Sequence, residues 1–120
     1  MKTFNITVEM LQAKGACMEG MRDFLTAYPK ETYPDGVDYQ ELLDACAQHD
    51  RDNDAEWMLN AFGRVAATLK LDGINSEKSI FFAGSIVVKG AIICKKHIRS
   101  GLGIEAGLGI EAGGGIEAGE

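Results

Sequence analysis

The chain has 120 residues, of which 46% are hydrophobic and 25% charged, and its formal net charge is -6. This balance is typical of a globular protein and excludes a largely disordered one. No apolar run approaches the roughly 20 residues that a membrane-spanning helix needs, so no membrane association is expected. An acidic chain without a basic stripe is also not expected to bind nucleic acid directly.

The cysteines and the first residues indicate the compartment. Cys17, Cys46 and Cys94 are odd in number, widely spaced and set in apolar patterns. Such cysteines are typical of reduced, buried thiols rather than of a disulfide framework. Residues 1–6 contain no apolar segment of the kind that a secretion signal requires. We therefore expect a cytoplasmic protein.

Residues 1–72 show the apolar spacing of four short helices and hold most of the acidic charge, with 7 Lys and Arg against 13 Asp and Glu. The alternation at 4–6 predicts a short strand. Thr7 is placed to cap a helix that ends at Gly15. The apolar residues within 17–28 lie on one stripe of a second helix.

Two further helices are predicted after the turn at 33–36. Asp38 with Glu41, and Asn53 with Glu56, have the spacing of capping boxes, and each pair precedes an apolar helical stripe. Four such short helices depend on packing against one another for their stability. The residues expected at the centre of this packing are Phe24, Leu25, Leu42, Trp57 and Phe62.

Two features of the sequence resemble metal sites. The segment 50–54 begins like a calcium loop, but that loop needs Gly where Ala55 stands and Glu where Ala61 stands. We interpret it as a solvated loop with a helix cap. His49 and His97 each lack a second His or Cys at the spacing of metal ligands. The chain is therefore expected to bind no metal and no cofactor.

The second half, 73–120, is built on a six-residue repeat. Isoleucine occurs at every sixth position eight times, at Ile74, Ile80, Ile86, Ile92, Ile98, Ile104, Ile110 and Ile116. Each hexad also places a small or apolar residue two positions after its isoleucine, which is the spacing of one face of a short strand. Glycines recur between the hexads, and the last three hexads are nearly identical, reading GIEAG.

A period of six cannot keep one face of an α-helix, whose period is about 3.6 residues. It is typical of a hexapeptide-type β-helix with isoleucines stacked inside and glycines in left-handed corners. A disordered Gly-rich linker is the alternative, but a linker has no reason to hold this register. The core is expected to contain Ile80, Ile86, Ile92, Ile98, Ile104 and Ile110.

These patterns together predict an α+β fold in which an acidic helical domain at 1–72 caps a hexapeptide-repeat β-solenoid at 73–120. The capping contact is expected to involve outward apolar residues of the first hexads, namely Phe81, Val87 and Ile93.

The segments 10–17, 35–39 and 79–90 resemble uncharacterised phage and prophage proteins of enteric bacteria. Those proteins carry GIEAG or GIKAG arrays, usually longer than this one, after a similar helical region. The resemblance implies a phage-encoded protein that acts in the cytoplasm of a bacterial host, and it brings no assigned activity. Many small acidic phage proteins inhibit host defence, the anti-CRISPR proteins among them.

Our first functional hypothesis is a non-catalytic protein that inhibits a host defence complex through an acidic surface. The segment 31–56 holds nine acidic residues and one base, so it can imitate nucleic acid toward a basic host protein or a nucleoprotein complex. An ordinary solvated helix face is the alternative interpretation. The candidate partner-binding residues are Asp44, Asp50, Asp52, Asp54 and Glu56.

The second hypothesis is a self-assembling structural module. The open-ended repeat predicts a homodimer through 101–120, in which terminal strands cover one another. The residues expected in this contact are Ile104, Ile110 and Ile116. A third hypothesis, an enzyme, is not favoured, because His97 is the only histidine of the repeat and has no carboxylate positioned beside it in the sequence. No catalytic residue is therefore proposed.

Overall fold

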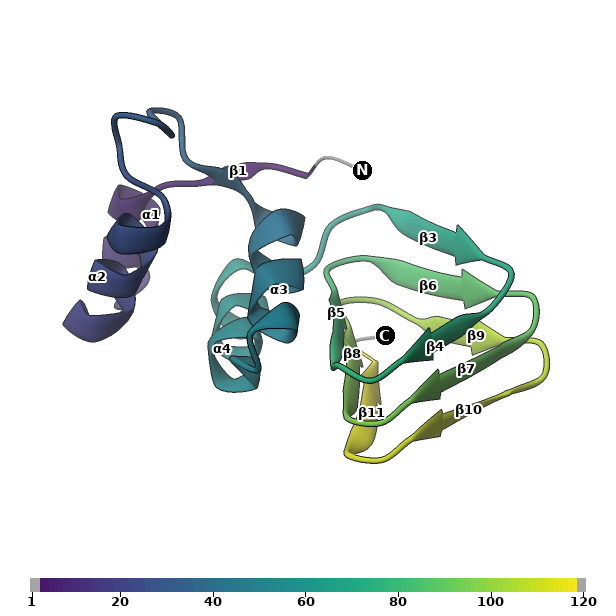
Figure 1. Cartoon of the computed structure of the whole chain (residues 1–120). Coiled ribbons are helices and arrows are strands. Elements are labelled where there is room, and N and C mark those ends of the chain that lie inside the picture. The colour runs from purple at the N-terminus through teal and green to yellow at the C-terminus, as the bar shows by residue number, and fades with distance from the viewer. Residues whose placement is uncertain (1–2, 119–120) are drawn as a thin grey trace. The chain divides into compact units, whose positions relative to one another are not determined.

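The computed structural model of the chain describes residues 3–118 (Figure 1). By their internal contacts the residues form two compact units, which divide between Leu42 and Leu43. This division does not coincide with the boundary predicted between 72 and 73. Among the described residues, no helix is long and apolar enough to cross a membrane.

The first unit contains two short strands and two helices, followed by the start of a third helix. Strand β1 (Asn5–Ile6) pairs antiparallel with β2 (Val37–Asp38), so that Ile6 lies opposite Val37. Helices α1 (Val8–Ala13) and α2 (Met18–Ala27) lie between these strands in the chain, and α3 (Tyr39–Gln48) follows β2 directly. The predicted strand at 4–6 and the first two predicted helices are confirmed.

Two of the predicted helix caps in this unit are confirmed. The Thr7 side chain accepts a hydrogen bond from the Met10 N–H at 3.2 Å and so begins α1. An Asp38 carboxylate oxygen accepts the Glu41 N–H at 3.3 Å, which satisfies one of the unpaired donors at the start of α3. The other oxygen of Asp38 accepts the Thr3 N–H at 2.6 Å, and this bond joins the residues before β1 to the end of β2.

The core of the first unit differs from the prediction. Ile6 and Tyr39 are fully buried, whereas Leu25 is exposed and Phe24 is only half-buried. Helix α2 contacts α1, but none of its residues is fully buried, and aromatic rings contact one another at its C-terminal end. There, Phe24 lies 5.5 Å from Tyr28 between ring centroids. The stripe was identified correctly, but its central place in a core was wrong.

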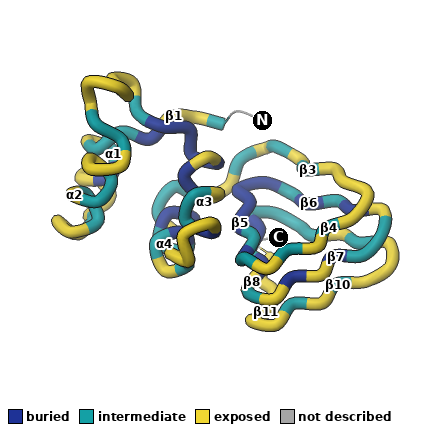
Figure 2. The backbone as a smooth tube through the Cα atoms, in the orientation of Figure 1, coloured by how far each residue is buried: buried dark blue, intermediate teal, exposed yellow. Residues whose placement is uncertain are grey.

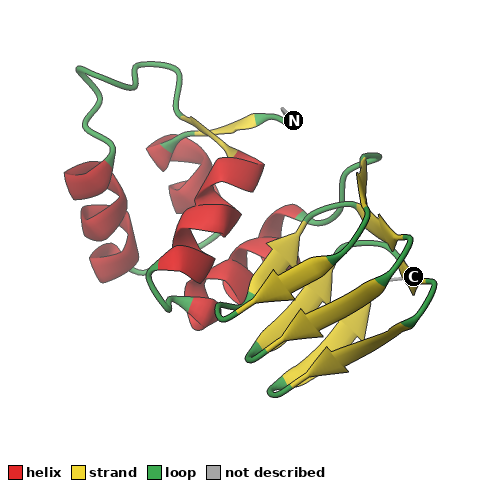
Figure 3. Cartoon of the chain, turned by 45° about the vertical axis from the view of Figure 1, so that its right-hand side comes forward, coloured by secondary structure: helices red, strands yellow, loops and turns green. Residues whose placement is uncertain are grey.

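The second unit combines α4 (Asp52–Phe62) and the end of α3 with nine short strands. The strands form three parallel sheets of three strands each, ordered β3-β6-β9, β4-β7-β10 and β5-β8-β11 (Figures 1 and 3). Consecutive strands therefore enter different sheets. Their bounds are Thr68–Leu71, Ile74–Ser76, Ile80–Phe82, Ser85–Val88, Ala91–Cys94, His97–Ser100, Ile104–Ala106, Gly109–Ala112 and Gly115–Ala118 for β3 to β11.

Three consecutive strands, one from each sheet, make up what we call a row. The first row is β3–β5, the middle row β6–β8 and the terminal row β9–β11. Paired residues are 18 positions apart in the sequence, as Ile74 with Ile92 and Ile92 with Ile110. The pair β3–β6 is the exception, because Leu69 lies opposite Ile86, only 17 positions away.

The residues predicted for the repeat core are confirmed. Ile86, Ile92 and Ile98 of the middle row are at most 1% exposed, and they form one cluster with side chains two positions after an isoleucine, such as Val88 and Cys94. Isoleucines of the flanking rows pack against this cluster and are partly buried. These are Ile74, Ile80, Ile104 and Ile110.

The glycines of the repeat act mainly through their small size, which corrects the predicted left-handed corners. Among the glycines of the repeat up to residue 118, only Gly109 and Gly115 have a positive φ. At Gly101 the reason for glycine is a close approach, because a Cβ there would lie 2.0 Å from the carbonyl oxygen of Ala83 in the preceding row. At Gly103 a Cβ would meet nothing within 4 Å.

The predicted fold class, a helical domain that caps a hexapeptide-repeat β-solenoid, is wrong. Residues 3–118 form a small α+β fold with four helices and several parallel sheets of short strands. Helix α4 belongs to the same compact unit as all three parallel sheets, and strand β3 precedes the predicted boundary. The three residues predicted to face outward differ in burial: Phe81 is buried, Val87 is half-buried and Ile93 is 42% exposed.

Replacing Ile92 by Ala should lower the free energy of unfolding by about 2–5 kcal/mol, because it leaves a cavity at the centre of the middle row. The adjacent Ile93 is the matched control, since it lies on the same strand but faces outward. Its change to Ala should alter stability by no more than about 0.5 kcal/mol. Urea unfolding of both variants measures this difference, and equal effects would show that the cluster is not a packed core.

Candidate functional site

Within the second unit, Asp50 joins the loop between α3 and α4 to the parallel sheets. Its carboxylate accepts hydrogen bonds from the ammonium groups of Lys78 at 2.9 Å and Lys96 at 2.5 Å. The two lysines occupy equivalent corners, since Lys78 follows β4, Lys96 follows β7, and these strands are paired. Asp50 has a φ of 57°, a left-handed conformation that aspartate tolerates better than most residues. One carboxylate therefore joins the helical segment to two successive rows.

These contacts change the acid–base properties of the corner. Hydrogen bonds from Lys96 and Lys78 lower the pKa of Asp50 from 3.8 to about 2. The same hydrogen bond raises the pKa of Lys96. Asp50 is therefore fully ionised at neutral pH, and its charge is balanced by two nearby ammonium groups.

Asp52 is engaged next to this corner. One of its oxygens accepts the Ser79 hydroxyl at 2.5 Å, and the Ser79 oxygen in turn accepts the His97 N–H at 3.2 Å. The other Asp52 oxygen is buried and has no hydrogen-bond partner among the described residues. Asp52 is the first residue of α4, where the helix dipole favours negative charge.

Two of the remaining acids of the predicted surface, Asp54 and Glu56, also contact basic side chains of the same chain, and Asp44 lies on a different helix. Asp54 forms an ion pair with Arg51 at 2.7 Å, and Glu56 lies 3.4 Å from the guanidinium of Arg99 on β8. Asp44 is exposed on α3. The structure thus brings Asp50, Asp52, Asp54 and Glu56 together at the start of α4, but it directs them mostly toward bases and a hydroxyl of their own chain. Helix α4 begins after Arg51 without a side-chain cap, so the predicted capping box at Asn53 is wrong.

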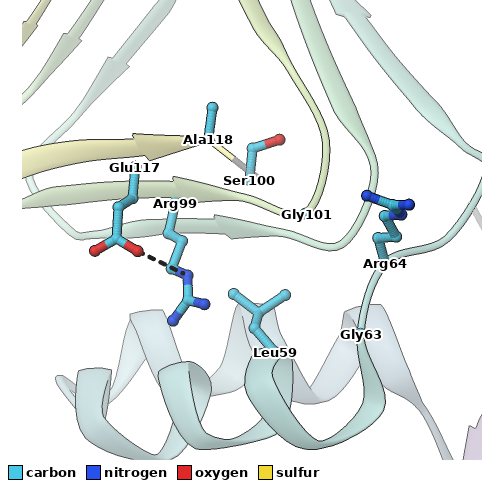
Figure 4. A pocket seen from close by; sticks show the side chains of 8 residues that line it. All are labelled: Leu59, Gly63, Arg64, Arg99, Ser100, Gly101, Glu117 and Ala118. Carbon is cyan, nitrogen blue, oxygen red and sulfur yellow. Dashed lines mark ion pairs between the residues drawn. The ribbon is translucent and has the colours of Figure 1, made fainter. Parts of the chain in front are cut away.

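A pocket of about 260 Å³ lies between α4 and the strands β8 and β11, within the second unit (Figure 4). Arg99 and Glu117 lie at one end of it and Arg64 at the other, with Leu59 of α4 between them. The Arg99 guanidinium donates to the Asn60 side-chain oxygen at 2.7 Å and lies 3.5 Å from the Glu117 carboxylate. Sequence reasoning missed this pocket, because its walls come from segments that are distant in the chain.

The terminal row holds the residues predicted for oligomerisation. Ile104 and Ile110 are partly buried, and Ile116 is 47% exposed. Strand β11 as a whole is exposed (Figure 2). Leu108, at a corner of the same row, is 81% exposed. The strands β9, β10 and β11 each lie at the edge of their sheet, so within residues 3–118 they are paired on one side only. Edges of this kind are available for pairing with another chain.

The cysteines are free thiols in three different environments. Cys94 is buried in the repeat core, as predicted, whereas Cys17 is exposed and begins α2 by accepting the Gly20 N–H. Burial of Cys46 raises the pKa of its thiol to about 11, so this cysteine is unreactive at neutral pH. The expectation of three buried thiols is therefore wrong for Cys17.

Residues 3–118 contain no group of three or more His, Cys, Asp or Glu side chains that is arranged to hold a metal ion. The carboxylates of the calcium-like segment 50–54 are instead occupied by Lys78, Lys96, Ser79 and Arg51.

Comparisons with models of protein families, with curated proteins and with solved structures found no match to this chain.

Changing Asp50 to Asn should destabilise the second unit in a pH-dependent way. Because the folded-state pKa is lowered from 3.8 to about 2, the carboxylate stabilises the fold above about pH 4, and this contribution is lost as the pH falls toward 2. The difference in urea midpoint between wild type and D50N should therefore be largest near neutral pH and shrink in acid.

The control for this experiment is Glu77→Gln. Glu77 forms a single ion pair with Lys95, both side chains being more than two-thirds exposed. Exposed single pairs contribute little, so its effect on the midpoint should be smaller than that of D50N. A D50N effect that is equal at every pH would rule out the two-lysine contact as its cause.

Proposed function

We propose that the chain is a non-catalytic binding protein that forms a homodimer. In this dimer the terminal row of one copy contacts the terminal row of a second copy. The observation that carries this proposal is the contrast between the middle and terminal rows. Ile98 is 1% exposed, whereas Ile116, its partner in register one row further on, is 47% exposed. The two residues are of one type and share one sheet, and within residues 3–118 β11 is paired with a strand on one side only.

A second copy suits this edge for two reasons. The three terminal strands present backbone donors and acceptors in one direction, so two copies related by a two-fold axis can pair them edge to edge. The hexads of this row are nearly identical and carry only alanine two positions after each isoleucine, at Ala106, Ala112 and Ala118. Small side chains allow two such rows to approach closely.

The outward glutamates of the row oppose this association. Glu105, Glu111 and Glu117 are all exposed, so two rows would bring like charges near one another. Salt screens exposed charges over about 10 Å at ~0.1 M. The proposed dimer should therefore become tighter, or stay equally tight, when salt is added, whereas binding of an acidic surface to a basic partner should weaken.

The resemblance to phage proteins supports a second step of the proposal, in which the dimer inhibits a defence complex in the host cytoplasm. The acidic residues at 50–56 contribute less to such binding than their number indicates, since Asp50 and Asp54 are paired with bases of the same chain.

Replacing Ile116 by Asp should convert the dimer to a monomer, because a carboxylate would be desolvated in the contact. Light scattering after size exclusion, at concentrations up to the high micromolar range, measures the mass. Circular dichroism verifies that the variant is folded.

The matched control is Leu108→Asp, which changes a more exposed apolar residue of the same row at a corner rather than on a strand. It should leave the dimer intact. A wild-type protein that is monomeric at high micromolar concentration, or a dimer lost with L108D but not I116D, would overturn association through the strand edges.

The inhibitory role predicts a phenotype in bacteria. Expression of the chain in a strain with an active CRISPR defence should raise the plating efficiency of a phage that this defence targets. The I116D variant should lose this effect if the dimer is the active form. Unchanged plating with well-expressed protein, across strains with different defence systems, would contradict the inhibitory role while leaving the dimer to be judged by its mass.

A further inference from the structure

We propose that Glu105 and Glu111 are the residues that limit how tightly two terminal rows associate, and that an ion pair with Arg99 keeps the equivalent Glu117 out of this contact. The inference rests on the proposed dimer and deepens it, because it assigns control of the contact to two of three chemically identical side chains. The three glutamates occupy equivalent positions of β9, β10 and β11, since each follows its isoleucine by one residue.

The register of the strands gives the three glutamates different neighbours in the middle row. Glu117 lies opposite Arg99, and its carboxylate is 3.5 Å from the Arg99 guanidinium. Within residues 3–118, neither Glu105 nor Glu111 forms an ion pair. The residues opposite these two are aliphatic and carry no charge, namely Val87 for Glu105 and Ile93 for Glu111.

Arg99 directs the Glu117 side chain toward the middle row and away from the edge of β11. Only 18% of the Arg99 side chain is exposed, and its guanidinium is fixed to α4 by Asn60 at 2.7 Å and by Glu56 at 3.4 Å. In Figure 4 the Glu117 carboxylate points toward this guanidinium. An exposed ion pair and a like-charge contact between opposing strands are of similar size, so the ion pair can offset repulsion at this position.

A two-fold dimer brings glutamate near glutamate whichever strand lies closest to the axis. One strand of the terminal row then pairs with its own copy, and the other two strands pair with each other. Because all three strands carry glutamate at the equivalent position, Glu105 and Glu111 each lie near a glutamate of the second copy. Like charges that face each other across paired strands are destabilising. Glu105 and Glu111 therefore weaken the contact, and Glu117 weakens it less.

Sedimentation velocity over a series of concentrations measures the Kd of the dimer for three variants that remove the same charge. At low salt, Glu105→Gln and Glu111→Gln should each lower the Kd about twofold to fivefold, because a like-charge contact is gone. The matched control is Glu117→Gln, which should change the Kd by less than about twofold. The E105Q/E111Q double variant should also lose most of the response of the dimer to added salt, since its main repulsive charges are absent.

Arg99→Gln tests the role of the ion pair. It releases Glu117, so the Kd at low salt should rise about twofold to fivefold, and the R99Q/E117Q double variant should return to the wild-type value. Circular dichroism verifies that both variants are folded, and the three glutamate variants decide the proposal if they are not. A folded double variant that stays as weak as R99Q would overturn the role of Arg99.

The outcomes separate this inference from the proposed dimer. If the wild-type protein dimerises and E105Q, E111Q and E117Q change the Kd equally, the inference is overturned and the dimer stands. If both the wild type and E105Q/E111Q are monomeric at high micromolar concentration, the dimer itself is overturned, and the inference with it. A double variant that dimerises where the wild type does not would support control by Glu105 and Glu111 and overturn the wild-type dimer.

Discussion

The near-constant offset of 18 residues between paired strands is the constraint on which the second unit depends. It places isoleucine above isoleucine inside the three sheets, and it aligns the remaining positions of each hexad with the equivalent positions of the next row. Where a row is covered on both sides, as at Ile92, the side chain is completely buried. Because successive rows are in close contact, residues such as Gly101 must be without a Cβ. Core, corners and outward residues thus follow from one geometric repeat.

The same offset produces the electrostatic contacts of α4. Lys78 and Lys96 occupy equivalent corners, so a single carboxylate, Asp50, reaches both. On the outer face of the β5–β8–β11 sheet, Phe81, Arg99 and Glu117 lie side by side in register. Phe81 is buried, and Arg99 is bonded to α4. The acidic segment therefore contributes to the attachment of the helix, and much of its charge is balanced within the chain.

Two features of the second unit meet at strand β11, and they differ in chemistry. Within residues 3–118 the terminal row has backbone edges that are paired on one side only, and Ile116 is partly exposed there. The pocket beside α4 is lined by Arg99, whose contacts with Glu56 and Glu117 are 3.4 and 3.5 Å long. Ile116 and Glu117 are adjacent residues of β11, and they have different surroundings because side chains alternate along a strand.

Much of the local structure could be predicted from the sequence. The period of six identified the short strands and their core residues, and the caps at Thr7 and Asp38 identified two helix starts. Strand β3 was missed because Leu69 stands five positions before Ile74 rather than six, and only pairing with β6 reveals it. The apolar stripe of α2 was recognised, but its shallow burial depends on which elements cover it.

The sequence by itself determined the repeat, the positions of the strands from β4 onward and the residues that stack inside them, since these depend on spacing along the chain. Only the tertiary structure decided that α4 and the parallel sheets form one compact unit, that Asp50 pairs with Lys78 and Lys96, and that Arg99 and Glu117 line a pocket with Leu59. The physical reason is that ion pairs and pockets bring together residues distant in sequence. No local sequence pattern shows which acidic side chain pairs with which basic side chain.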